Sequence, residues 1–118
     1  MFTQPTNMNN KQKTKENKSR NINKDDDLFL SSQIGGWVYI LKSKKDSKLY
    51  LGSTNNLRKR FQEHNLGKVF STKNRIPFDL VYSEIYKSEK DARMREHNLK
   101  LRRQAYTQLK RRIQDSLK

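Results

Sequence analysis

The chain contains 118 residues (14.1 kDa), of which 31% are hydrophobic, and this content suffices for one small domain but excludes two independent cores. The formal charge of +15 and a pI near 10.2 predict a polyanionic partner, and the absence of cysteine excludes disulfides, thiolate zinc sites and cysteine nucleophiles. No apolar run approaches the roughly 20 residues that span a bilayer, and no signal-peptide pattern opens the sequence, so we expect a cytoplasmic protein without a membrane partner.

Residues 1–34 are rich in Asn, Lys, Gln, Thr and Ser. Because so few apolar side chains cannot offset the entropy lost on ordering, we expect a disordered, basic and polar arm. Its six basic and four acidic residues leave a charge of +2, whereas residues 35–118 carry +13. The folded part is therefore the basic part, and the arm is either a plain extension or a tether for nucleic acid.

A β-hairpin is predicted after Gly35-Gly36. Residues 37–42 alternate in the way a half-buried strand does, a polar turn follows, and residues 48–53 form the second strand. The hairpin places Tyr39 near Tyr50 and Gly52. The two tyrosines alone would be packing residues, but a glycine inside a strand indicates close approach of the backbone to another element or to substrate.

A helix is predicted next, with Thr54 or Asn55 as its cap and Gly67 as its left-handed end. Leu57 and Phe61 recur at helical spacing and mark its inner face. Arg60 and His64 lie four positions apart, so they share one face. His64 either orients a phosphate or forms a hydrogen bond between the helix and the sheet.

Residues 68–76 form a basic loop, and residues 78–86 read as a third strand. Within the loop, Lys73 and Arg75 are candidate contacts to a phosphate backbone. Thr72 is a candidate hydrogen-bond donor to a phosphate oxygen.

A second helix is predicted after Ser88, its cap. Ala92, Glu96 and Leu99 share a face of this helix. An acid on an inward face is costly unless it is paired or bound to metal, so Glu96 is a candidate metal ligand. A structural ion pair between Glu96 and Arg60 is the alternative.

A basic amphipathic helix is predicted over residues 101–118. An apolar residue recurs at every fourth position from Leu101 to Leu117, with Arg102 and Arg103 among the surrounding cations. The stripe either closes the core or docks on a protein partner, and the two arginines are candidate nucleic-acid contacts. The expected fold is α/β (α+β), with a small three-stranded mixed or antiparallel sheet in the order β-β-α-β-α and an extra C-terminal helix.

Several of these residues form a pattern of their own. They are Trp37-Val38-Tyr39, Tyr50-Leu51-Gly52, Arg60 and His64, and Glu96 within Ala92–Lys100. In this order and spacing they resemble the GIY-YIG nuclease superfamily, in particular its small single-domain bacterial members related to the nuclease module of the excision-repair protein UvrC. The resemblance covers residues 37–100 and places the nuclease domain at 35–100. The first motif keeps its tyrosine but lacks the leading glycine.

The resemblance implies roles for these residues. A motif tyrosine would help to activate the attacking water, Arg60 would contact the scissile phosphate, and Glu96 would be the only protein ligand of Mg²⁺ or Mn²⁺. A single carboxylate is compatible with Mg²⁺, which keeps most of its waters. A phenol has an ordinary pKa near 10, so Arg60 or the metal would have to lower it. The sequence leaves open whether Tyr39, Tyr50 or His64 takes the proton.

The leading hypothesis is therefore a metal-dependent endonuclease that hydrolyses DNA phosphodiester bonds. Its expected partner is branched or otherwise structured DNA, read by its structure or backbone more than by its base sequence. The resemblance favours DNA over RNA and suggests DNA repair, although the residues themselves define neither the pathway nor a sequence preference. The alternative is a non-catalytic nucleic-acid-binding module that retains the fold. A third hypothesis is a scaffold protein that uses the stripe from Leu101 to Leu117.

Overall fold

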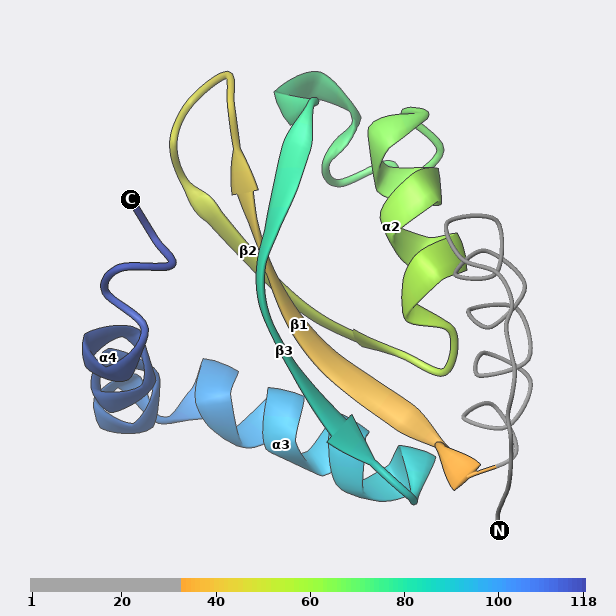
Figure 1. Cartoon of the computed structure of the whole chain (residues 1–118), viewed down its shortest axis with the longest axis vertical. Coiled ribbons are helices and arrows are strands. Elements are labelled where there is room, and N and C mark those ends of the chain that lie inside the picture. Colours follow the sequence, from red (N-terminus) through yellow and green to blue (C-terminus); the bar gives the residue numbers. More distant parts are fainter. Residues whose placement is uncertain (1–32) are drawn as a thin grey trace, which may run out of the picture. The chain divides into compact units, whose positions relative to one another are not determined.

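Three antiparallel strands in the order β2-β1-β3 form the centre of the fold (Figure 1). The computed structural model describes residues 33–118, so the predicted arm lies outside them apart from its last two positions. The elements are β1 (Gly36–Ser43), β2 (Leu49–Thr54), α2 (Leu57–Asn65), the short 3₁₀ helix η1 (Lys73–Arg75), β3 (Phe78–Tyr86), α3 (Glu89–Leu101) and α4 (Arg103–Arg112). The predicted α+β class is confirmed, and the sheet is purely antiparallel. Within the described range, no helix is long and apolar enough to cross a membrane.

The two faces of β1 are covered by different helices. Val38 and Ile40 are fully buried in a core that includes residues of α3 and α4, whereas Tyr39 and Leu41 pack with residues of α2. Figure 1 shows α2 on one side of the sheet and α3 and α4 on the other. This division follows from the alternation of side chains along a strand. It places Tyr39 on the α2 face.

The ends of the first two helices follow local capping chemistry. Asn56, not Thr54 or Asn55, is the cap of α2, because its side chain accepts a hydrogen bond from the backbone N–H of Lys59 at 3.1 Å. The prediction of Gly67 as a left-handed residue is confirmed by its φ of 75°. Ser88 caps α3 as predicted.

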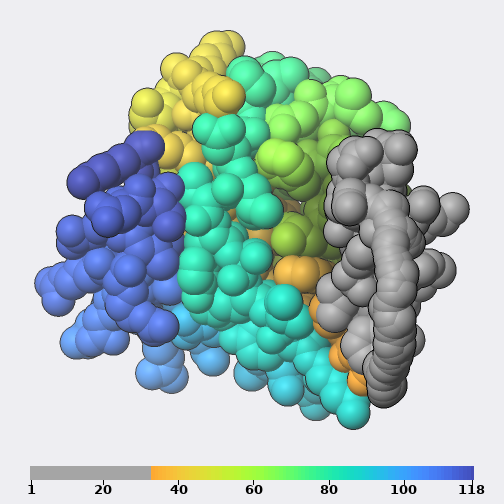
Figure 2. Space-filling model, in the orientation of Figure 1, coloured from red at the N-terminus to blue at the C-terminus, as the bar shows by residue number. Residues whose placement is uncertain are grey.

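The C-terminal stripe does not form one continuous helix. The backbone of Arg102 is extended, so α3 ends at Leu101 and α4 begins at Arg103. Leu109 is 2% exposed in the core, and of the five stripe positions Leu101 alone is largely exposed, at 67%. Figure 2 shows α4 (blue) beside β3 (teal). The stripe therefore serves to close the core, which is the first of its two predicted roles.

Candidate active site

Two phenols and an imidazole cluster on the α2 face of the sheet. The ring centroid of His64 lies 5.7 Å from that of Tyr39 and 5.0 Å from that of Tyr50, and the two phenol rings are 6.3 Å apart. The hairpin brings the phenols together because Tyr39 is paired with Gly52, two residues beyond Tyr50. The structure thus unites three of the predicted site residues.

His64 has no exposed surface and uses both ring nitrogens within the protein. Its Nε2 lies 2.9 Å from the Tyr39 hydroxyl, and its Nδ1 lies 2.8 Å from Oγ1 of Thr72. Because Tyr39 accepts from Arg60, its own hydroxyl proton is directed to Nε2. Nδ1–H then donates to the Thr72 hydroxyl, which has the carbonyl of Val69 at 3.5 Å as its own acceptor. Burial, followed by the charge of Arg60, lowers the pKa of His64 to about 4. The side chain is therefore a neutral acceptor, of the kind predicted between helix and sheet.

Tyr39 holds its proton firmly. It is 1% exposed, and this burial, with the neighbouring Tyr50, raises its pKa to about 12. A hydrogen bond from Arg60 lowers the value but does not outweigh burial. Of the two influences expected to lower this pKa, Arg60 or a metal, Arg60 acts in the expected direction but leaves the pKa above its ordinary value. In the free protein, the proton stays on Tyr39 rather than on His64.

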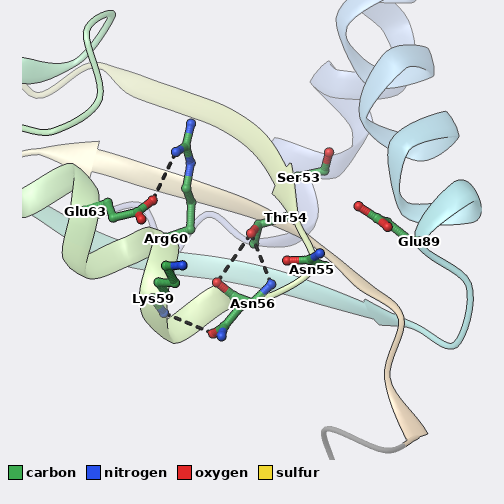
Figure 3. A pocket seen from close by; sticks show the side chains of 8 residues that line it. All are labelled: Ser53, Thr54, Asn55, Asn56, Lys59, Arg60, Glu63 and Glu89. Atoms are coloured by element: carbon green, nitrogen blue, oxygen red, sulfur yellow. Dashed lines mark hydrogen bonds and ion pairs between the residues drawn. The ribbon is translucent and has the colours of Figure 1, made fainter.

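Arg60 reaches from α2 into an open cleft of about 290 Å³ (Figure 3). Its guanidinium donates to Oε1 of Glu63 at 3.1 Å and contacts the phenol of Tyr39. The Arg60 side chain is 39% exposed, so it connects the buried phenol with solvent. The cleft is lined by Ser53, Thr54, Asn55, Asn56, Lys59, Arg60, Glu63 and Glu89. Figure 3 shows Glu89 facing the cleft from the α3 side.

Glu96 lies on α3 and does not itself line the cleft. Its carboxylate accepts from the hydroxyl of Ser53 at 2.5 Å and pairs with Nζ of Lys100 at 2.6 Å. The predicted alternative, an ion pair with Arg60, is not the one formed. Because Ser53 also lines the cleft, this hydrogen bond attaches Glu96 to the cleft edge. The negative charge of Glu96 contributes to raising the pKa of Tyr39.

The donor set around Glu96 suits a cation that keeps its own water ligands. Residues 33–118 contain no group of three His, Cys, Asp or Glu side chains that could enclose a metal. The Glu96 side chain is 20% exposed, and Lys100, its ion-pair partner, is 53% exposed and can turn away. One accessible carboxylate fits Mg²⁺ or Mn²⁺ held mainly by water and substrate oxygens, and does not fit a site built from protein ligands alone.

Two residues predicted to bind nucleic acid are buried instead. Thr72 is fully buried and positions His64, so its hydroxyl does not face a phosphate. Gly52 is also buried, and a Cβ placed there would lie 2.6 Å from the Tyr39 hydroxyl. The close approach that explains this glycine is therefore to Tyr39 and not to substrate.

The predicted cationic contacts differ in their surroundings. Arg75 donates to Asp46 at 2.8 Å and is 25% exposed, so it mainly ties the loop to the hairpin turn. Lys73 is exposed beside Phe70, and Arg102 and Arg103 are exposed at the junction of α3 and α4. None of these four lines the cleft.

Of the eight cleft residues, only Arg60 was predicted as a site residue. The seven that sequence reasoning missed are Ser53, Thr54, Asn55, Asn56, Lys59, Glu63 and Glu89, of which Thr54 and Asn55 were expected only as helix caps. Ser53 carried a usable signal, because alternation along β2 places it on the same face as Leu51, toward α3. Lys59, Glu63 and Glu89 had none, since each is one charge among many on an exposed helix.

Comparisons with known proteins agree with this geometry. A family model described as the GIY-YIG catalytic domain matches residues 35–113. A UPF0213 protein of Clostridium perfringens is 46% identical over 65 residues, which cover 54% of this chain and 69% of that protein. UPF0213 proteins of Staphylococcus haemolyticus and Natronomonas pharaonis are 45% and 40% identical over 65 residues, covering 78% and 75% of their lengths and 54% of this chain.

The name UPF0213 states no activity, and no solved structure matches the chain. The family match spans both faces of the sheet and every predicted catalytic residue, from Tyr39 to Glu96. The chain therefore belongs to the GIY-YIG family.

Proposed function

We propose that the protein is an endonuclease that hydrolyses DNA phosphodiester bonds with the help of Mg²⁺ or Mn²⁺. One observation carries this proposal: Arg60 stands in an open cleft while its guanidinium contacts the buried Tyr39 phenol. A phosphate bound in the cleft would thus meet a permanent cation next to a group able to exchange a proton. A planar guanidinium suits this role because it can bind two phosphate oxygens at once.

The proton path runs through Tyr39 and His64. A water beside the phosphate would give its proton to the phenolic oxygen while Tyr39 passes its own proton to Nε2 of His64. The pKa values of about 12 for Tyr39 and about 4 for His64 oppose this transfer in the free protein. The net transfer is from water to His64, so the path requires a charge that favours loss of the proton from the water, and displacement of Arg60, whose charge lowers the pKa of His64.

Arg60 controls access to this path. Because Tyr39 is 1% exposed, substrate must draw the guanidinium away from the phenol and from Glu63 before water can reach the site. Glu96, with Ser53 holding one of its oxygens, is the residue that would hold the cation. When bound, Mg²⁺ or Mn²⁺ supplies the charge that stabilises the leaving oxygen and lowers the proton affinity of nearby groups.

The test is nicking of supercoiled DNA by the wild type, Arg60→Ala and Glu96→Gln, with Mg²⁺ and with EDTA. Loss of an oriented charge donor typically lowers rate by about 10²–10³ fold, so both variants should fall by at least that much. The matched controls are Arg111→Ala on α4 and Asp91→Asn on α3, which remove exposed charges outside the cleft. Equal cutting by all five proteins, or cutting in EDTA, would refute the proposal.

The second candidate is a binding module without catalysis. It is favoured by the nearly complete burial of Tyr39 and by the ion pair that Lys100 makes with Glu96. Such a module would bind DNA equally well in EDTA, lose affinity steeply with salt, and be indifferent to Glu96→Gln. Binding without any metal-dependent nicking would select this function.

A further inference from the structure

The loop after α2 presents one aromatic side chain to solvent. Phe70 is 83% exposed, although Val69 before it is 8% exposed and Thr72 after it is fully buried. An apolar ring of this size is normally buried, so its exposure means that the fold lacks the favourable free energy that burial would contribute. Its position therefore calls for a binding partner or for a local reason.

The exposure of Phe70 is not explained by a loop without fixed contacts. Thr72 donates its backbone N–H to Val69 at 3.1 Å, and Arg75 donates its backbone N–H to Thr72 at 2.9 Å. The Thr72 side chain is bound to His64, and Arg75 is held by Asp46. The backbone on both sides of Phe70 is thus anchored, and the anchors point inward while the ring points outward.

The surroundings of the ring favour nucleic acid over protein. Nζ of Lys73 lies 4.8 Å from the ring centroid of Phe70, and Lys68 is exposed in the same loop. An aromatic ring among cations matches a nucleobase flanked by phosphates, whereas an apolar protein partner would leave these ammonium groups to be desolvated. The charge of +13 on residues 35–118 points the same way.

We propose that Phe70 stacks on an unpaired base of the DNA substrate, with Lys68 and Lys73 on the adjacent phosphates. The inference rests on the proposed nucleic-acid substrate. A base can stack on an exposed ring only when it is not enclosed in a duplex, so Phe70 confers a preference for bubbles, bulges or single-stranded junctions. Through Thr72 and His64 the loop is attached to Tyr39, so a base held at Phe70 has a defined position relative to the cleft.

The test measures binding in EDTA, where nicking does not interfere. Fluorescence anisotropy would compare a perfect duplex with the same duplex carrying a three-nucleotide bubble, and a 2-aminopurine in the bubble would report stacking. Wild type should prefer the bubble. Phe70→Ala should weaken bubble binding by about ten-fold, as expected for loss of one stacked base, and change duplex binding by less than about two-fold. Phe70→Trp should retain both the affinity and the 2-aminopurine quenching.

Ile85→Ala is the matched control, because Ile85 is a 56% exposed apolar residue on β3, outside the basic loop. The inference is overturned if wild type binds both DNAs equally or neither, if Phe70→Ala weakens both to the same extent, or if Ile85→Ala has the same effect. The nuclease proposal is tested separately, because it fails if no nicking occurs with Mg²⁺. That result would not change the expected preference of the protein for the bubble.

Discussion

Acidification should destabilise the protein through His64. The pKa of this side chain is lowered from 6.5 to about 4 in the folded state, by burial first and by Arg60 second. The unfolded chain therefore binds a proton that the folded chain rejects, so stability is complete above pH 6.5 and is lost as pH falls toward 4. Between about pH 7.5 and about pH 5, these two pKa values correspond to a loss of about 2 kcal/mol.

Carboxylates contribute mainly at lower pH. The pKa of Asp46 is lowered to about 2 by its hydrogen bond from Arg75, and that of Glu84 lies below 4.5 because its bonds to Arg95 and two tyrosines outweigh burial. The stability that each carboxylate adds is therefore complete above its ordinary pKa and is lost as pH falls below that pKa. The change in stability between pH 6.5 and 4.5 is therefore due to His64.

The assay is urea denaturation at a series of pH values, followed by the fluorescence of Trp37, the single tryptophan. His64→Gln should remove most of the pH dependence between pH 7.5 and 5, whereas His97→Gln, which changes the only other histidine, should preserve it. A His64→Gln protein with the wild-type pH dependence, or an imidazole titrating near pH 6.5 by NMR in the His97→Gln protein, would refute the assignment of His64 as a buried neutral acceptor.

Three further predictions concern the surroundings of the site. Thr72→Val leaves Nδ1–H of His64 unpaired and should lower the nicking rate by about ten-fold with the fold intact, as judged against Ser71→Ala. Glu84→Gln should reduce the free energy of unfolding by about 2 kcal/mol in urea, because the 15% exposed carboxylate accepts four hydrogen bonds. Lys100→Met frees one oxygen of Glu96 and should lower the Mg²⁺ concentration for half-maximal nicking by about two-fold; an unchanged or higher value would contradict that role.

Patterns along the chain predicted the elements well because helix and strand periodicities are local. The third strand was expected over residues 78–86 and is found there as β3, since its alternation and the preceding Pro77 mark it clearly. The same holds for the shared face of Arg60 and His64 on α2. The cap of that helix was misplaced because Thr54, Asn55 and Asn56 all have suitable side chains, and only the backbone path selects Asn56.

Errors at the candidate site arose where distant segments meet. Thr72 and Gly52 were expected to face nucleic acid, but contacts with His64 and Tyr39 enclose them. The attachment of Glu96 to Ser53 joins residues 43 positions apart, and the tie between Arg75 and Asp46 joins residues 29 apart. Such contacts depend on how the helices pack on the sheet. The residues next to each of them in the sequence carry no information about this packing.

The sequence by itself determined the fold class, the basic character of the folded part and the family motif residues from Tyr39 to Glu96, because these follow from composition, periodicity and motif order. The tertiary structure alone decided their electrostatic state. Burial of Tyr39 outweighs the charge of Arg60 and raises the phenol's pKa, and burial of His64 makes it a neutral acceptor. The desolvation that sets these values exists only after the helix has covered the sheet.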